Sequence, residues 1–476
     1  MRTKLLVLLL CLWSTSFVHA QFFESDGLYY EITSSTNHEV SVKSADVKEQ
    51  IIIPSKVEYN GEQYTVTRID DYAFYGSFSS IAFSESLVSI GSMAFYGCYS
   101  LTSVDVPSEN ANFLSLDGVL FTKDGTVLIL YPAGKETALY TVPAEVTVIG
   151  DYAFSSSSSL SSVILPEGLK SIGIYAFGGC VSLSSISLPK NLMNIGENAF
   201  DGCYALTSID VAFDNPYFLS NDGILFTKDK TSLIRYPAGK QTSSYSVPES
   251  VTTICDGAFN SCSSLTSIIL PDGLTTIGIG AFSACVLLSS IILPDGLTDI
   301  NHFMFRECKS LVSIILPSNL NTIGDNVFEG CSSLSSVIFP KSLMMIGYDA
   351  FYNCSALSSI YSNAVTPPEI SGFYTFDGVN KDIPVYVPQE SLEAYKTSSG
   401  WSYFTNFQDL ATSVNQSERP DGLSISDGKL HNAEGLFIEI NDMNGRPVYR
   451  GTDATVSLPS GVYIIRCKSS AFKIAL

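Results

Sequence analysis

The sequence predicts a mainly β protein built as a solenoid of 23-residue turns. Three observations predict it: a recurring Ala-Phe motif, strand-like spacing inside each repeat, and Pro and Gly at the corners of the clearest unit. Successive phenylalanines of the motif are mostly 23 residues apart, with one step of 21 and two of 59. They are Phe74, Phe95, Phe154, Phe177, Phe200, Phe259, Phe282, Phe305, Phe328 and Phe351. A fixed period in the twenties is typical of units that bury their apolar side only against their neighbours.

One full unit runs from 262 to 284. Leu265, Ile268 and Leu270 have the Leu-x-x-Leu-x-Leu spacing of a leucine-rich repeat, with a short parallel strand whose inward residues are two apart. Pro271 has no N–H to donate and therefore ends that strand. The remaining inward positions and the corner glycine are Leu274, Ile277, Gly278, Ala281 and Phe282.

The two 59-residue steps contain a longer unit, found at 113–135 and again at 218–240. Each copy carries Asp-Gly between apolar stretches, at Asp117-Gly118 and at Asp222-Gly223, which is a strong hairpin signal. We expect two inserted β-hairpin modules. The alternative, that these aspartates bind calcium, is less favoured because their spacing is not that of an EF-hand loop.

The N-terminus has the features of a secretory signal peptide over residues 1–20. Basic Arg2 and Lys4 precede an apolar run, and a small-residue cleavage pattern ends at Ala20. No other stretch is long enough to cross a membrane, so the mature chain is expected to lack a transmembrane segment. The remaining predicted regions are a β-rich N-terminal cap (21–68), the solenoid (69–361), a C-terminal cap (362–410), a linker (411–427) and a small β domain (428–476).

The chain is acidic. Its net charge of −21 becomes −23 once Arg2 and Lys4 leave with the signal peptide. Such a surface repels nucleic acid and anionic membranes, so neither is an expected partner.

Seven cysteines occupy the same place in successive repeats. In-register stacking predicts a column of inward, reduced thiols, since a free cysteine behaves as a small buried hydrophobe. Disulfides or a metal site are the less favoured alternatives, because no Cys-x-x-Cys pair or neighbouring His is present. The column is Cys180, Cys203, Cys262, Cys285, Cys308, Cys331 and Cys354.

No residue set predicts catalysis, so we expect no enzyme, no cofactor and no metal site. Three histidines remain after removal of the signal peptide, and His38, His302 and His431 are far apart in sequence. His302 is expected near the surface, at a repeat position where the usual residue has been replaced. Nucleophile-elbow, phosphate-loop and zinc-protease motifs are missing from the sequence.

The residue that follows the central inward position of each strand should project outward on the sheet face. This column is apolar in the second half of the solenoid, and a column of serines runs beside it. The two columns together form the candidate binding site, called the ribbon below: Ile269, Ile292, Ile315, Ile338, Tyr361, Ser267, Ser290, Ser313, Ser336 and Ser359. The apolar half reflects either the fit of β-branched residues to stacked strands or an exposed patch that binds a partner.

The repeat block resembles the BspA-like leucine-rich-repeat family of bacterial surface proteins. The resemblance rests on units such as Ile172-Gly-Ile-Tyr-Ala-Phe-Gly-Gly-Cys180-Val-Ser-Leu-Ser-Ser-Ile-Ser-Leu-Pro189. The tail looks like the C-terminal sorting domains of Bacteroidetes secreted proteins, through Asp442-Met-Asn-Gly445-Arg and Leu458-Pro-Ser-Gly-Val-Tyr463. These resemblances imply a secreted or cell-surface protein that adheres to host proteins or other cells without catalysis.

Three functions are therefore open. The first is binding of a protein or glycan ligand on a host or bacterial surface. The second is a structural stalk or envelope component without a specific ligand. The third is an unrecognised enzyme site, which a deep pocket with converging carboxylates would indicate.

Overall fold

A computed structural model describes residues 21–46, 49–410, 423–426, 429–432, 436, 438–442, 447–457, 462–467 and 470–475. The predicted signal peptide, most of the predicted linker and the Asn444-Gly445 turn lie outside these residues. The chain divides into two compact units, residues 1–124 and 125–476.

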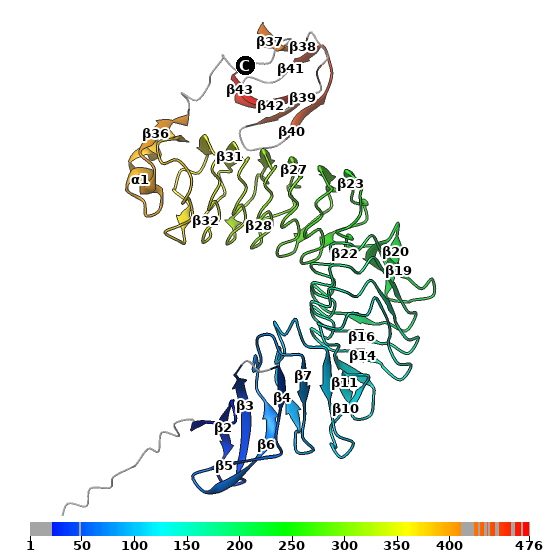
Figure 1. The fold of residues 1–476 in the computed structure, drawn as a ribbon. Coiled ribbons are helices and arrows are strands. Elements are labelled where there is room, and N and C mark those ends of the chain that lie inside the picture. The colour runs from blue at the N-terminus through cyan, green and yellow to red at the C-terminus, as the bar shows by residue number, and fades with distance from the viewer. Residues whose placement is uncertain are drawn as a thin grey trace, which may run out of the picture. The chain divides into compact units, whose positions relative to one another are not determined.

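The prediction of a mainly β leucine-rich-repeat solenoid is confirmed. Each regular turn contributes one strand of three or four residues and one strand of two residues, and each kind stacks in parallel on the equivalent strand of the next turn (Figure 1). We call the row of longer strands the face ladder and the row of two-residue strands the short ladder. The register follows the repeat: Ser162 lies opposite Ser185, and Ser171 opposite Asn194, each 23 residues on.

The N-terminal unit begins with a sheet in the order β1-β2-β3-β6-β5, which β8 extends from β6. Its strands are β1 (Phe22–Ser25), β2 (Leu28–Ser34), β3 (Glu39–Ala45), β5 (Lys56–Tyr59), β6 (Glu62–Ile69) and β8 (Ser89–Ile90). The face ladder here consists of β4 (Gln50–Ile52), β7 (Ser80–Ala82) and β9 (Ser103–Asp105). The region expected as a cap therefore also supplies the first face strand, because β4 pairs in parallel with β7.

The C-terminal unit also contains both kinds of ladder. Its face strands are β13 (Leu139–Thr141), β15 (Ser162–Ile164), β17 (Ser185–Leu188), β19 (Ser208–Val211), β23 (Ser244–Ser246), β25 (Ser267–Ile269), β27 (Ser290–Ile292), β29 (Ser313–Ile315), β31 (Ser336–Phe339) and β33 (Ser359–Ser362). The short ladder holds β12 (Val127–Leu130, longer than the others), β14 (Val148–Ile149), β16 (Ser171–Ile172), β18 (Asn194–Ile195), β24 (Thr253–Ile254), β26 (Thr276–Ile277), β28 (Asp299–Ile300), β30 (Thr322–Ile323), β32 (Met345–Ile346) and β34 (Glu369–Ile370).

The two inserted hairpins form as predicted. In the N-terminal unit β10 (Phe113–Leu116) pairs antiparallel with β11 (Val119–Thr122). In the C-terminal unit β20 (Phe218–Asn221), β21 (Ile224–Thr227) and β22 (Ser232–Arg235) form an antiparallel meander. Asp117 and Asp222 both have φ 52°, and the following glycines have φ 75° and 74°, so turn chemistry accounts for both Asp-Gly pairs.

The strand stacking continues beyond Tyr361, where the repeat motif fades. β35 (Pro384–Val387) and β36 (Asn406–Asp409) extend the face ladder in parallel from β33. Between them lie η1 (Gln389–Ser391), α1 (Leu392–Thr397) and η2 (Trp401–Tyr403). The pairing outlasts the motif because it uses backbone groups, which every non-proline residue carries.

The described part of the tail is antiparallel. It comprises β37 (Leu423–Ser426), β38 (Lys429–Asn432), β39 (Ile438–Asp442), β40 (Pro447–Gly451), β41 (Thr455–Ser457), β42 (Val462–Cys467) and β43 (Ser470–Ala475). β37 pairs with β38, so 423–426 form a strand within the stretch predicted as a linker. Its Leu-Ser-Ile-Ser alternation is strand-like, and the polar, Pro- and Gly-rich composition around it obscured that signal.

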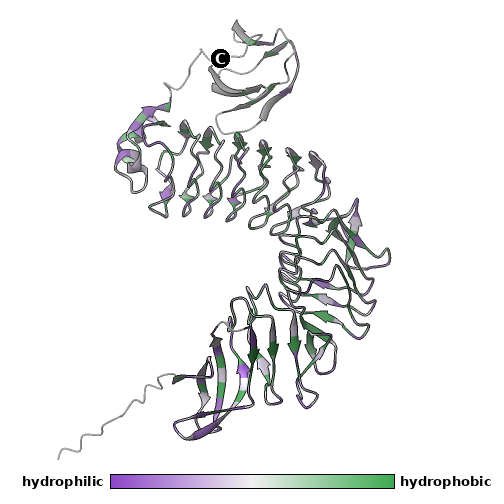
Figure 2. Ribbon diagram, viewed as in Figure 1, coloured by the Kyte–Doolittle hydropathy of each residue, from purple (hydrophilic) through white to green (hydrophobic). Residues whose placement is uncertain are grey.

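Stacked phenylalanines form the centre of the solenoid. In the C-terminal unit the rings of Phe282, Phe305 and Phe328 lie 5.5 and 5.7 Å apart with interplanar angles of 5° and 4°. All three side chains are completely buried. Colouring the backbone by hydropathy shows many apolar residues on the stacked strands (Figure 2).

Candidate functional site

The face ladder presents one apolar side to the core and the other to solvent. The central residue of each strand is buried, as for Val163, Ile186 and Ile268, while the serine before it and the residue after it point outward. This alternation follows from the two-residue period of a strand. The predicted inward and outward assignment is therefore correct along most of the ladder.

A column of hydroxyl residues directly before the face strands is used internally. Most of these hydroxyls donate to the backbone carbonyl of the residue one turn earlier, as from Thr207 to Ser184 at 3.1 Å and from Thr266 to Ser243 at 2.9 Å. These bonds tie neighbouring turns together. Their hydroxyls are accordingly less available to a ligand.

The neighbouring serine column of the ribbon differs. The hydroxyls of Ser267, Ser290, Ser336 and Ser359 bond to no other residue in the described part of the chain. Ser290 is exposed and the other three are half-buried. Ser313 lies in the same column and does take part in an interaction.

The apolar column of the ribbon is unevenly exposed, so it does not form the continuous exposed patch that one of the two alternatives required. Ile269 is 65% exposed, Ile292, Ile338 and Tyr361 are half-buried, and Ile315 is only 8% exposed. Neighbours contribute to this difference. Ile269 lies in register with the small side chain of Ser246, whereas Ile315 lies in register with Ile292.

Tyrosines extend the ribbon at its C-terminal end. The rings of Tyr361 and Tyr386 stack at 4.9 Å with an interplanar angle of 10°. Burial, with a smaller contribution from Tyr361, raises the pKa of Tyr386. The stack therefore adds an uncharged aromatic surface to the face ladder.

A hollow lies elsewhere on the same face, over β15, β17 and β19. It is a groove of about 480 Å³ lined by residues of these strands and of the segments that follow them, among them Glu167. Ser187 lies between the larger Ile164 and Asp210 of the adjacent strands, so the column dips at the serine. All three residues belong to the outward column that the repeat predicts. A small side chain between two larger ones is the sequence signal for the groove, and it was missed because only the apolar half of the column was chosen as the candidate site.

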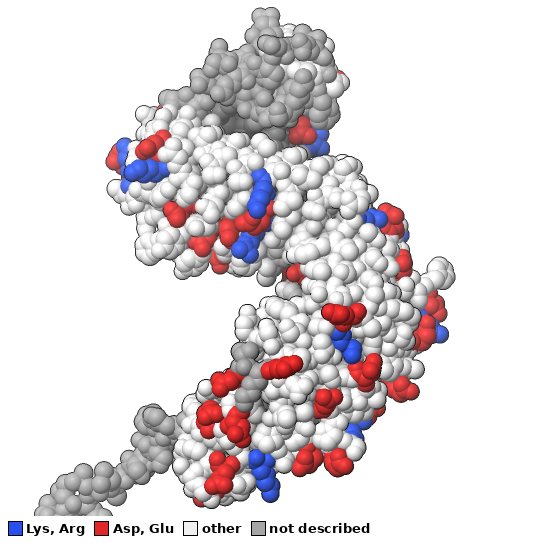
Figure 3. Space-filling model, viewed as in Figure 1, with Lys and Arg blue, Asp and Glu red and all other residues white. Residues whose placement is uncertain are grey.

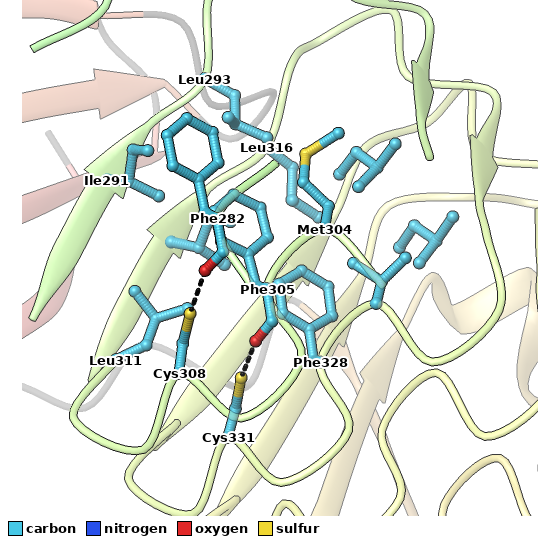
Figure 4. Packing of buried hydrophobic residues seen from close by; sticks show 14 of the residues in the cluster. Phe282, Ile291, Leu293, Met304, Phe305, Cys308, Leu311, Leu316, Phe328 and Cys331 are labelled. Carbon is cyan, nitrogen blue, oxygen red and sulfur yellow. Dashed lines mark hydrogen bonds between the residues drawn. The ribbon is translucent and has the colours of Figure 1, made fainter. Parts of the chain in front are cut away.

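The cysteine column is a structural feature. All seven predicted cysteines are free and buried, and each thiol donates to the carbonyl of the residue 26 positions earlier, as from Cys308 to Phe282 and from Cys331 to Phe305 (Figure 4). Burial raises the thiol pKa throughout, to about 12 for Cys203. Since the thiolate is the reactive form, these groups are poor nucleophiles and poor metal ligands.

His302 occupies a position that aspartate fills in other turns. Its Nδ1 accepts the backbone N–H of Asp325 at 2.9 Å, just as Asp256 accepts that of Ile279. The side chain is 48% exposed, in agreement with the predicted surface position. This histidine thus maintains the contact between turns.

Groups that could hold a metal ion are missing among the described residues. Within the same residues, no helix has the length and apolar character needed to span a membrane. On the displayed face, acidic side chains outnumber basic ones (Figure 3).

Comparisons with known proteins agree with this geometry. The family model described as BspA type leucine rich repeat region matches residues 49–121, 135–220 and 238–358. A leucine rich cell surface protein from Faecalibacterium prausnitzii is 27% identical over 72% of this chain and 95% of its own, with a TM-score of 0.51. The pneumococcal vaccine antigen PcpA is 22% identical over 82% of this chain and 97% of its own, with a TM-score of 0.46. No curated protein matches.

Proposed function

Because the chain belongs to the BspA type leucine-rich repeat family, we propose that it is a secreted or cell-surface protein that binds a protein or glycan ligand through its face ladder. Adhesion to host proteins or to other cells is the specific role we propose. The chain has no catalytic role in this proposal. The similarity to a leucine rich cell surface protein supports the location.

The proposal rests mainly on the different hydrogen bonding of the two hydroxyl columns. Hydroxyls such as Thr266 hold the turns together, whereas Ser267 and Ser290 on the outward face have no partner among the described residues. Beside them, Ile269 exposes 65% of its surface. Unused hydroxyls next to exposed apolar groups supply both the polar and the apolar contacts that an interface needs.

The test is retention of the purified mature chain on immobilised extracellular-matrix proteins and mucins. The variant Ile269→Ser/Ile292→Ser removes exposed apolar surface from the face ladder. Its matched control, Ile279→Ser/Met344→Ser, removes exposed apolar side chains that lie off that face. Ile315 is left unchanged because its burial would mix a loss of stability into the result.

We expect saturable retention that the face variant weakens about tenfold and the control leaves unchanged. Retention that both variants weaken equally would place the interface elsewhere. A chain that binds none of these surfaces would favour the structural stalk. Export guided by the tail remains a separate prediction, and deletion of residues 423–476 followed by cell fractionation tests it.

A further inference from the structure

The groove over β15, β17 and β19 carries two carboxylates without a charged partner among the described residues. Glu167 and Asp210 both line it, and neither forms an ion pair with any described residue. Asp210 is held in place by the hydroxyl of Ser208, which donates to its Oδ1 at 2.9 Å. None of the lining residues is Lys or Arg, so the groove has no positive charge of its own.

The remaining lining supports a cation with an aliphatic stem. Ile164 is 51% exposed at one side of the groove, and Ser187 provides a hydroxyl between it and Asp210. Lysine and arginine bury their methylene groups on apolar surface and keep the charged end beside polar groups. No aromatic ring lines the groove, so it lacks the stacking platform that a sugar would use.

The dimensions fit a side chain presented by a larger partner. The groove spans three adjacent strands, which at about 4.8 Å per strand gives roughly 10 Å. Its volume of about 480 Å³ falls in the range of small-ligand sites. The chain's net charge of −21 also favours approach of a basic partner.

We propose that this groove binds a lysine or arginine side chain from an extended segment of a partner protein. The basic group lies between Glu167 and Asp210, its stem packs on Ile164, and Ser187 bonds to the polar atoms that remain. This inference rests on the proposed function and names the chemistry of the partner.

Fluorescence anisotropy with the full mature chain tests it, using a labelled peptide of alternating lysine and serine. A peptide of alternating glutamate and serine is the negative probe. Glu167→Gln/Asp210→Asn removes the charges while keeping the side-chain shapes, and Ser187→Trp fills the hollow without changing the charge. The matched control Glu85→Gln/Asp105→Asn removes the same charge from exposed positions of the N-terminal unit, where Asp105 also accepts a bond from a serine two residues earlier.

We expect each groove variant to weaken binding of the lysine peptide about tenfold and the control to change it less than about twofold. Circular dichroism of every variant confirms that the fold is kept. An equal loss in the control, an unaffected Ser187→Trp variant, or no binding by the unaltered chain overturns the inference. If free lysine amide binds as tightly as the lysine peptide, the groove binds small amines and the proposed peptide segment is wrong.

The outcomes separate this inference from the proposed function. If the groove variants bind the peptide normally while Ile269→Ser/Ile292→Ser still reduces retention on matrix proteins, the inference fails and the proposed function stands. If retention is absent but the groove variants lose the peptide, the groove stands and the proposed adhesion fails.

Discussion

The two hairpin modules, 113–135 and 218–240, use the same local chemistry in two places of the chain. In each, an asparagine just before the hairpin is fully buried and makes four hydrogen bonds. Asn110 donates to the carbonyls of Ser84 and Leu87 and accepts from the N–H groups of Asn112 and Phe113. The equivalent partners of Asn215 are the carbonyls of Pro189 and Leu192 and the N–H groups of Tyr217 and Phe218.

The turns of the modules also act alike. The carbonyl of Gly118 accepts the N–H of Val104 at 3.0 Å, and that of Gly223 accepts the N–H of Ile209 at 2.9 Å. Each hairpin therefore covers the last face strand of the preceding repeats. An uncovered strand edge would offer unpaired backbone groups to other chains, so the modules protect the ladder where it is interrupted.

The modules differ in charge at the position of Arg235. Where the first has Leu130, the second has Arg235, which is 4% exposed. Its guanidinium donates to the carbonyls of Gly257 and Asn260, and its Nη1 lies 3.7 Å from Asp201 Oδ1. The same hairpin therefore forms with either an apolar or a charged residue at this position. In the second module Arg235 contacts Asp201 before the insertion and Gly257 and Asn260 after it, and so connects the repeats on both sides.

The largest expected effect is on the shared asparagine. Asn215→Ala leaves two carbonyls and two N–H groups without their partner, and we expect the free energy of unfolding to fall by about 4 kcal/mol. Urea unfolding followed by tryptophan fluorescence and circular dichroism measures it. Asn110→Ala should cost a similar amount, and a difference of more than about 2 kcal/mol between the two would break the equivalence of the modules.

Next comes the position of this charge difference. Arg235→Leu places the residue of the first module into the second and leaves Asp201 without its counter-charge, so we expect a loss of about 3 kcal/mol. The double variant Arg235→Leu/Asp201→Asn should recover most of it. Unchanged stability of Arg235→Leu would show that the charge contributes nothing at this joint.

A smaller effect is expected at the turn glycine. Gly223 has φ 74°, and an added Cβ would lie 2.7 Å from the Ser208 hydroxyl. Gly223→Ala should lower the free energy of unfolding by about 2 kcal/mol and speed hydrogen exchange at the Ile209 amide. Gly273→Ala is the control, because no atom lies within 4 Å of its added Cβ; equal effects at both glycines would contradict the account.

The smallest effect concerns the surface contact of the second module. The ammonium of Lys240 lies 3.1 Å from Asp222 Oδ2 and donates to the Asp222 carbonyl at 2.7 Å. Lys240→Ala should reduce stability by about 0.5 kcal/mol, since Asp222 is largely exposed and water screens the pair. Measuring the same variant in high salt checks this, because a screened ion pair loses its contribution there.

The repeat and its local chemistry were predictable because they depend on neighbours in the sequence. The period places Phe282 on Phe305, and Asp-Gly specifies the positive φ angles of the hairpin turns. The groove was not predictable in the same way. Its hollow depends on three side chains that are 23 residues apart, Ile164, Ser187 and Asp210, and on their different sizes.

The sequence by itself determined the solenoid, the inward cysteines and the two hairpins, because periodic burial and turn geometry are local properties repeated many times. Only the tertiary structure decided how exposed each outward residue is. Ile269 and Ile315 occupy the same place in their repeats, yet one is exposed and the other buried. Exposure depends on the size and arrangement of all the side chains that lie beside a residue in space, and the repeat pattern alone does not specify these.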